Sequence, residues 1–241
     1  MAAVLEICVD DLAGVEAAVA GGADRIELCS ALEIGGLTPS PALIWHAVAT
    51  GVTVHAMIRP RAGNFLLDAR DVALMADDIR LALDLGAAGV VIGSLLPDRT
   101  LDHSALAAFR AAAGDAILVL HRAIDLTPDP IAAIRDAGNL GIDKVLSSGG
   151  ARTAHEGTIT LAAMVATAGD RLKVIAGSGV RPDNVVDIML RTGVREVHSS
   201  ATIAAPPAEP DVQRLGFGGN RVVVDVDMIK RLRAAVRESV A

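Results

Sequence analysis

Residues 22–26 read Gly-Ala-Asp-Arg-Ile, and a glycine that leads through a short turn into an apolar run recurs along the chain. The pattern returns at residues 86–90, 141–145 and 193–197, as Gly-Ala-Ala-Gly-Val, Gly-Ile-Asp-Lys-Val and Gly-Val-Arg-Glu-Val. A glycine of this kind ends a helix in a left-handed conformation and leads the chain into the next element. The repeat therefore predicts units that each contain a helix, a turn and a strand.

Eight short apolar runs fit the strands of such units. They cover residues 4–9, 25–30, 52–58, 89–92, 117–122, 144–147, 171–176 and 195–199. Their starts advance by about 27 residues, which suits one strand, one helix and two short loops. We predict an α/β fold, a single (β/α)8 TIM-type barrel over residues 1–241, in preference to an open doubly wound sheet. The strand-end motifs span residues 4–201, and a Pro/Gly-rich loop and a C-terminal helix occupy residues 205–241.

Composition narrows the class of function. The chain has 241 residues, of which 52% are hydrophobic and 2% aromatic, and its formal net charge is −7. Nucleic acid is not an expected partner, because binding it needs excess positive charge and, for single strands, aromatic faces. No apolar run approaches the roughly 20 residues that span a bilayer, and no basic, apolar leader opens the sequence. With only two cysteines, we expect a cytoplasmic protein with no membrane partner.

Polar side chains gather where the predicted strands end, which is the functional end of a (β/α)8 barrel. Because side chains alternate along a strand, Glu6 shares a face with Cys8, and Glu27 shares one with Cys29. Buried carboxylates need cationic partners, and the nearest candidates in the strand-end motifs are Arg59, Arg61 and Arg122. We expect one cavity to contain Glu6, Glu27, His55, Arg59, His121, Arg122 and His198, either as an active site or as a salt-bridged polar plug.

Glycine-rich ends of the later strands predict an anion site. Backbone N–H groups in such turns, followed by a helix N-terminus, bind phosphate, and barrels often place this site after strands seven and eight. The candidate anion-binding residues are Arg61, Ser148, Gly149, Gly177, Gly179, Ser199 and Ser200. The alternative is that these turns need glycine only for its positive φ.

Two kinds of chemistry lack their sequence signals. A Schiff-base lysine must face inward near a strand's end, whereas Lys144 and Lys173 lie near the starts of predicted strands and Lys230 lies on the last helix. Neither a Gly-x-Gly-x-x-Gly turn before a helix nor a P-loop is present in the sequence, so no nucleotide cofactor is expected.

The two cysteines end neighbouring predicted strands, which lie about 4.8 Å apart in a sheet. Thiolates from Cys8 and Cys29 across that gap would suit a soft monovalent ion such as Cu(I). The alternative is a pair of small buried core thiols without a metal.

At these strand ends the sequence resembles the CutC family, which is named for copper homeostasis. The matching segments are residues 5–10, 21–30, 35–40, 57–61, 121–125, 148–150, 176–182 and 198–201. The resemblance implies a cytosolic TIM-type barrel that is usually a homo-oligomer, a dimer or a tetramer. It also implies that Cys8 and Cys29 match the family's proposed Cu(I) ligands. The chain departs from the family pattern at residues 62–64, Ala-Gly-Asn, and at Ser178, where glycine is usual.

Two functional hypotheses follow. In the first, the chain handles copper and binds Cu(I) through Cys8 and Cys29. In the second, it is a lyase, isomerase or hydrolase without a Schiff base that acts on a small phosphorylated or carboxylated metabolite. The second hypothesis assigns a general base to Glu6 or Glu27, an acid–base partner to His55 or His121, and anion stabilisation to Arg59, Arg61 and Arg122. A scaffold without a site is the third interpretation.

Overall fold

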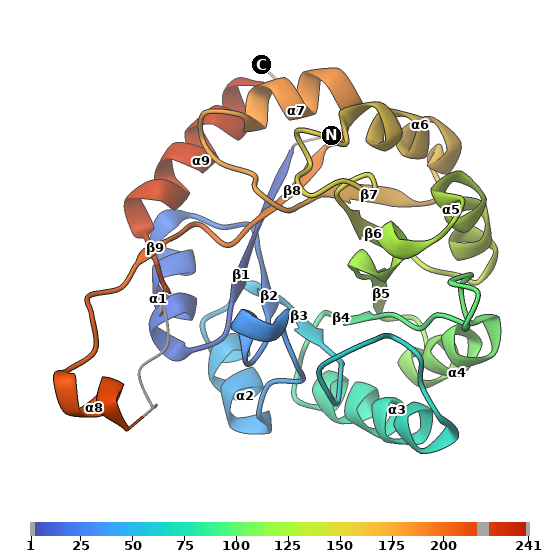
Figure 1. The fold of residues 1–241 in the computed structure, drawn as a ribbon, viewed down its shortest axis with the longest axis horizontal. Coiled ribbons are helices and arrows are strands. Elements are labelled where there is room, and N and C mark those ends of the chain that lie inside the picture. The colour runs from blue at the N-terminus through green and yellow to red at the C-terminus, as the bar shows by residue number, and fades with distance from the viewer. Residues whose placement is uncertain (1–2, 216–221, 240–241) are drawn as a thin grey trace.

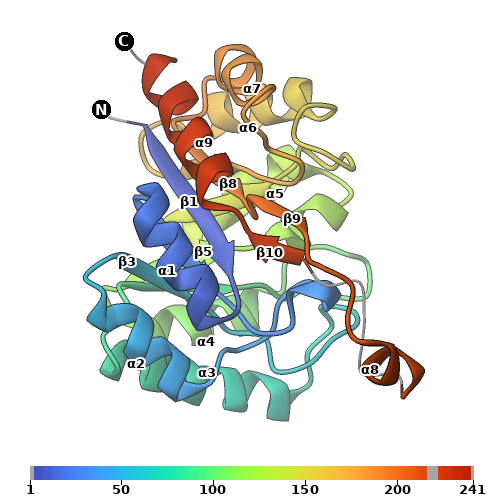
Figure 2. The same ribbon diagram turned by 90° about the vertical axis from the view of Figure 1, so that its left-hand side faces the viewer.

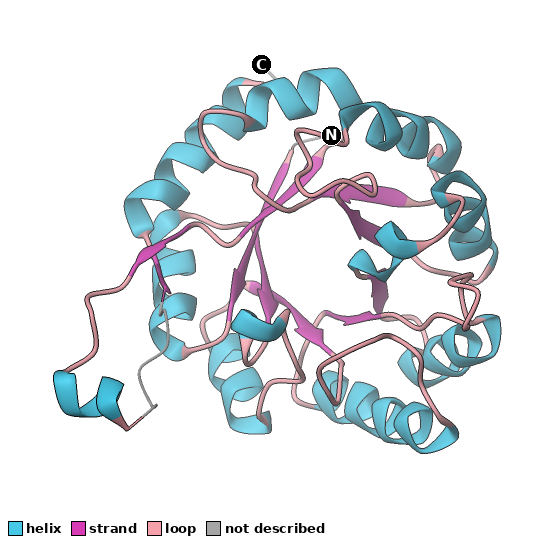
Figure 3. Ribbon diagram, in the orientation of Figure 1, coloured by secondary structure: helices cyan, strands magenta, loops and turns pink. Residues whose placement is uncertain are grey.

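Eight parallel strands form a closed barrel, and helices surround it (Figures 1 and 3). The computed structural model describes residues 3–215 and 222–239. The barrel strands are β1 (Val4–Val9), β2 (Arg25–Leu28), β3 (Thr53–Met57), β4 (Gly89–Ile92), β5 (Ile117–Leu120), β6 (Lys144–Ser147), β7 (Lys173–Ala176) and β8 (Glu196–Ser199). Each strand pairs with its neighbours in sequence, and β1 closes the ring by pairing with β8. The predicted (β/α)8 barrel is confirmed.

The helices lie outside the barrel, as in a TIM barrel (Figure 3). They are α1 (Leu12–Gly21), α2 (Pro41–Ala49), α3 (Ala69–Asp84), α4 (His103–Ala113), α5 (Pro130–Asn139), α6 (Thr158–Ala168), α7 (Val185–Thr192), α8 (Pro210–Arg214) and α9 (Val226–Glu238). Two 3-10 turns, η1 (Leu32–Ile34) and η2 (Arg122–Leu126), lie in the loops after β2 and β5. Their place after strand ends puts both turns at the mouth of the barrel.

Short sequence signals set the helix ends. Asp11, Ser40, Asp102 and Asp129 precede helices and accept hydrogen bonds from the first-turn amides, which would otherwise lack a partner. The glycines of the repeated turn also behave as predicted, since Gly22, Gly86, Gly141 and Gly193 all have positive φ. The turn between helix and strand is therefore encoded locally.

Apolar side chains fill two shells. The outer shell lies between the strands and the helices and includes the fully buried Phe109, Met75 and Leu106. The inner shell lies inside the barrel and consists of Cys8, Cys29, Met57, Val91, Val119, Leu146 and Ile175. The barrel interior near the cysteines is thus a packed core.

A small hairpin extends the fold between β8 and α9. β9 (Thr202–Ala204) pairs antiparallel with β10 (Val222–Val224), and α8 lies apart from the barrel body (Figure 2). The sequence predicted an irregular loop over residues 205–220; residues 216–220 of it, including Phe217, lie outside the described residues. Over the described residues, no helix has both the length and the hydropathy needed to cross a membrane.

Candidate functional site

Charged side chains occupy the barrel interior below the cysteines. Arg25 donates hydrogen bonds from Nε to Glu6 Oε2 at 2.5 Å and from a terminal nitrogen to Glu196 Oε2 at 2.7 Å. Lys144 Nζ lies 2.5 Å from Glu196 Oε1. Arg25 and Glu6 are almost fully buried. Because two cationic side chains face two carboxylates, the charges inside the barrel are balanced.

Glu6 joins this network to the histidines. Its Oε1 lies 2.8 Å from His198 Nδ1, and its Oε2 lies 3.8 Å from His55 Nδ1. Burial raises the pKa of Glu6, but Arg25 and His198 outweigh it and bring that pKa well below its usual range. Burial lowers the pKa of His55 to about 4, so its ring is neutral. Glu6 is therefore a fixed carboxylate, which suits orienting a histidine better than accepting a proton.

The two cysteines lie beside a carboxylate and an imidazole. Cys8, Glu27 and His198 each offer a donor atom within 4.8 Å of the others. Cys29 Sγ lies 3.7 Å from Glu27 Oε2, and His198 Nε2 lies 3.9 Å from the same oxygen. Both cysteines are free thiols within the inner apolar shell. Among the described residues, Cys8, Glu27 and His198 are the one set of three ligand side chains this close together, and Cys29 adjoins them through Glu27. We term these four residues the thiol cluster.

Electrostatics keep the thiols protonated without a ligand. A hydrogen bond with Cys29, burial and the Glu27 charge raise the pKa of Cys8 well above its usual range. Cys8 lowers the pKa of Cys29, but burial and Glu27 raise that pKa to about 11. Burial raises the pKa of Glu27 as well. Burial opposes the charge of His198, but Glu27, Cys8 and Glu6 raise its pKa well above the usual value.

A second polar group lies where β3 and β5 end. His121 Nδ1 accepts a hydrogen bond from the Ala123 amide, while its buried Nε2 has no partner in the described structure. Burial and then Arg59 lower the pKa of His121 to about 4. Its ring packs against Phe65 at a centroid distance of 4.8 Å, and the Arg59 guanidinium lies 5.1 Å from the Phe65 centroid. The His121 ring is therefore neutral, with its proton on Nε2, and it does not belong to the thiol cluster.

The prediction that Arg59, Arg61 and Arg122 pair with the buried carboxylates is wrong. Arg59 donates to the carbonyls of Ile34, Gly36 and Gly63. Arg61 binds Asp71 at 2.8 Å, and Arg122 binds Asp125 at 2.8 Å. The cation that binds Glu6 is Arg25, which the sequence analysis missed because it begins a strand. Side-chain alternation could have found it, since Arg25, Glu27 and Cys29 share one face of β2.

The Ser148-Gly149 turn already binds an anion that belongs to the chain. Asp125 accepts hydrogen bonds from the amides of Ser148 and Gly150 and from the hydroxyls of Ser147 and Ser148. The Gly149 amide donates to Ser147 Oγ. In this structure the donors expected to hold an external anion therefore hold a carboxylate, because η2 brings Asp125 against the turn.

The other candidate anion residues are also bonded within the chain or turned to solvent. The Gly177 amide donates to the Ser147 carbonyl, and Ser199 Oγ donates to the Val180 carbonyl. The Gly179 carbonyl accepts from Asn184, and Ser200, which is exposed, lies 3.3 Å from Thr202 between hydroxyl oxygens. Gly179 has a positive φ of 68°, which agrees with the alternative that this turn needs glycine for its conformation.

Inward-facing glycines make room for the three histidines. A methyl group on Gly93 would overlap the His121 ring. One on Gly89 would lie 3.0 Å from His55, and one on Gly177 would lie 3.3 Å from the His198 Cβ atom. A methyl group on Gly177 would also overlap Leu146, at 2.5 Å from its Cδ1 atom. Packing therefore requires glycine at this position, whether or not the turn binds an anion.

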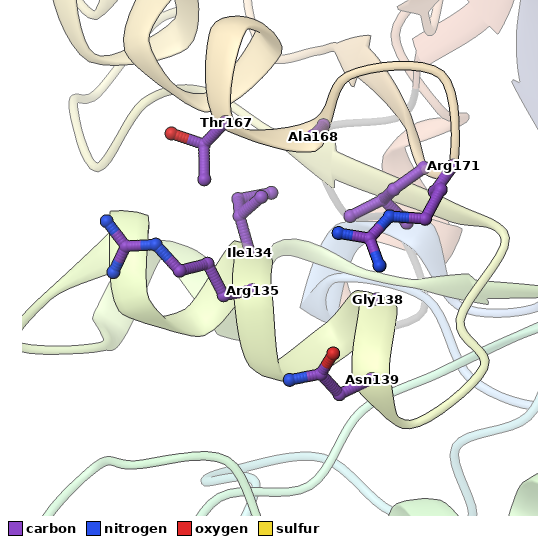
Figure 4. Close-up of a pocket in the computed structure, with 8 residues that line it drawn as sticks. Ile134, Arg135, Gly138, Asn139, Thr167, Ala168 and Arg171 are labelled. Carbon is purple, nitrogen blue, oxygen red and sulfur yellow. The ribbon is translucent and has the colours of Figure 1, made fainter.

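A separate cleft lies between α5 and α6, away from the strand ends (Figure 4). Its volume is about 170 Å³, and its lining includes Arg135, Asn139, Thr167 and Arg171. The two helices end there, so the cleft opens at the end of the barrel where strands begin. None of the predicted site residues lines it.

Comparison with known proteins agrees with this geometry. The fold and site define a parallel (β/α)8 barrel with paired thiols at the ends of β1 and β2. The family model for the CutC family matches residues 3–203. A family protein CutC from Rhizobium meliloti is 45% identical over 95% of this chain and 94% of its own length, and one from Caulobacter vibrioides is 45% identical over 98% and 95%. The chain belongs to the CutC family.

Solved structures with a similar fold include one that is named as a CutC protein. CutC of Streptococcus agalactiae, for which a copper homeostasis role has been suggested, has a TM-score of 0.79 and 30% identity, covering 82% of this chain and 98% of its own. A structure assigned as a deoxyribose-phosphate aldolase from Coccidioides immitis has a TM-score of 0.61 at 20% identity, covering 83% of this chain and 81% of its own. The second similarity shows the barrel fold alone.

Proposed function

We propose that this chain handles copper and binds Cu(I) through Cys8 and Cys29 at the mouth of the barrel. The observation that carries the proposal is the pair of free, buried thiols at the ends of the adjacent strands β1 and β2. Thiolate sulfur is a soft ligand and favours Cu(I) over harder ions. Membership of the family and the suggested role of the Streptococcus agalactiae protein support a link to copper.

The surroundings suit a soft ion kept away from water. Met57, Val91 and Leu146 belong to the same inner shell as the two cysteines and are almost fully buried. Because both thiols are protonated at neutral pH without a ligand, binding Cu(I) displaces their protons. Free thiols persist in a reducing compartment, so the proposal includes a cytoplasmic location, and from the resemblance a homo-oligomer, a dimer or a tetramer.

An anaerobic Cu(I) titration tests the proposal, with a chromophoric Cu(I) chelator as competitor. Wild type should bind one Cu(I) per chain, and Cys8→Ser and Cys29→Ser should each weaken binding by at least about 100-fold. His103→Gln, which removes an exposed histidine whose ion-pair partner is Asp136, is the control and should bind as wild type does. A double Cys8→Ser, Cys29→Ser variant that kept wild-type affinity would end the copper proposal.

A second candidate function is catalysis on a small phosphorylated or carboxylated metabolite. It is favoured by two buried polar atoms that lack a partner in the described structure, Glu27 Oε1 and His121 Nε2. In that role Glu27, whose pKa is raised by burial, suits a general base better than Glu6, and His121 would donate a hydrogen bond. Arg59, Arg61 and Arg122 are bonded within the chain and would have to reorganise to bind an anion.

The two functions separate in a thermal-shift screen against a metabolite pool. A metabolite that stabilises the wild type but not Glu27→Gln would favour catalysis, whereas Cys29→Ser should leave that stabilisation in place. Stabilisation by Cu(I) alone, lost in Cys29→Ser, would favour copper handling.

A further inference from the structure

The thiol cluster contains more ligand types than Cu(I) needs. Cys8 sulfur, a Glu27 carboxylate oxygen and a His198 imidazole nitrogen lie within 4.8 Å of one another, and Cys29 adds a second sulfur 3.7 Å from Glu27 Oε2. The donors come from three adjacent strands, because the register sets Cys8 beside Glu27 and Glu6 beside His198. Two soft sulfurs are sufficient for Cu(I), whereas Zn²⁺ binds thiolate sulfur, imidazole nitrogen and carboxylate oxygen alike and takes four such ligands in a tetrahedron.

The orientation of His198 is set by a second shell of residues. Its Nδ1 lies 2.8 Å from Glu6 Oε1, and Glu6 is an acceptor that Arg25 holds in place at 2.5 Å. His198 Nδ1 therefore carries the proton of that hydrogen bond, and Nε2 points to the side of Cys8 and Glu27. A carboxylate that fixes a histidine in this way is a regular feature of protein zinc sites.

Glu27 supplies the observation that calls for a cation. It is 3% exposed, and its Oε1 has no hydrogen-bond partner in the described structure. Arg25, the nearest arginine along the strand, is bonded to Glu6 and Glu196. A buried carboxylate oxygen without a donor is costly, and a metal ion bound between Glu27, His198 and the thiols would satisfy it.

We propose that Cys8, Cys29, Glu27 and His198 together form a site for a single Zn²⁺ ion. The inference rests on the proposed use of Cys8 and Cys29 as metal ligands, and it adds two ligands and a different ion that binds in place of Cu(I). On binding, both thiols release their protons to solvent, as does His198 Nε2 when it is protonated. Glu6 is a positioning residue, because it contacts the His198 ring and not the ion.

The test is a Zn²⁺ titration of the full chain under a reductant, with a chromophoric zinc chelator as competitor. Wild type should bind one Zn²⁺ per chain. His198→Gln and Glu27→Gln should each weaken binding by at least about 100-fold, and Glu6→Gln by about 10- to 100-fold. The matched controls are His103→Gln and Glu16→Gln, which change exposed residues outside the cluster and should bind Zn²⁺ as wild type does.

Co²⁺ provides a spectroscopic probe of the ligand set. Tetrahedral coordination with two thiolates should give intense visible bands and a sulfur-to-cobalt charge-transfer band. Both kinds of band should change in His198→Gln and Glu27→Gln and persist in Glu6→Gln. If His198 had only a structural role, its replacement would leave the cobalt bands unchanged. If His198→Gln fails to fold, Glu27→Gln, which keeps the shape of its side chain, is sufficient for the test.

The outcomes separate this inference from the copper proposal. If Cu(I) binding depends on both cysteines but Zn²⁺ affinity is unchanged in His198→Gln and Glu27→Gln, the four-ligand site is refuted and copper handling stands. If Zn²⁺ binding depends on all four residues and Cu(I) does not bind, the four-ligand site stands and the copper proposal fails. Six-coordinate Co²⁺ without a sulfur band would also refute the four-ligand site.

Discussion

Replacing Arg25 by methionine tests whether the charged network supports the barrel. Arg25 is 5% exposed and binds Glu6 at 2.5 Å and Glu196 at 2.7 Å. Removing one partner from a buried ion pair costs about 3–5 kcal/mol, because the remaining charge is uncompensated. Each carboxylate keeps a second cationic neighbour, His198 for Glu6 and Lys144 for Glu196. We therefore expect the lower end of that range, a loss of about 3 kcal/mol in the free energy of unfolding.

Urea denaturation at pH 7 measures the effect. The matched control is Arg80→Met, which removes the same side chain from an exposed pair with Asp77 and should change stability by less than about 0.5 kcal/mol. Adding Glu6→Gln to Arg25→Met should recover part of the loss, because glutamine leaves no buried charge. The reasoning is refuted if Arg25→Met costs less than about 1 kcal/mol, or if the added Glu6→Gln makes the loss larger.

Three further changes test local features. Ala31 has a φ of 50°, and Ala31→Gly should raise the free energy of unfolding by about 0.5 kcal/mol in urea melts, because strain in the left-handed region exceeds the entropy cost of glycine. Gly93→Ala should lower it by about 2 kcal/mol or more, since the new methyl group overlaps the His121 ring; an unchanged midpoint would contradict this packing. His121 has a folded pKa lowered from 6.5 to about 4, so the unfolded chain binds a proton first as the pH falls. Stability should therefore fall by about 2 kcal/mol between pH 7 and pH 5 through this residue, and His121→Gln should remove that part of the loss; an identical pH dependence in the variant would refute the assignment.

Local signals were sufficient to predict the barrel. The glycine turns at Gly22, Gly86, Gly141 and Gly193 recur because each helix must end and lead into the next strand. The strand starts were also predicted closely, although the structure ends β2 at Leu28 and β3 at Met57. The residues that follow those ends, among them Cys29 and Arg59, lie beyond the paired positions of β2 and β3, at the mouth of the barrel.

The candidate site was only partly predictable. The sequence indicated that Glu6 shares a face with Cys8 and Glu27 with Cys29, because alternation along a strand is a local property. That this face points into the barrel was an expectation from the fold. It did not indicate that Asp125 would fill the turn at Ser148, since that contact depends on how η2 folds back over β6. Nor did it distinguish a glycine that binds an anion from one that makes room for neighbouring side chains, as Gly177 does for Leu146 and His198.

The sequence by itself determined the order of elements, the closed parallel barrel and the pair of thiols near its mouth, since these follow from periodicity and from residues close together in the chain. Only the tertiary structure decided which charges meet. Glu6 and His198 are 192 residues apart, and Arg25 and Glu196 are 171 apart. They come into contact because β1 pairs with β8 in one particular register, and that register is fixed by closing the whole barrel rather than by any single segment.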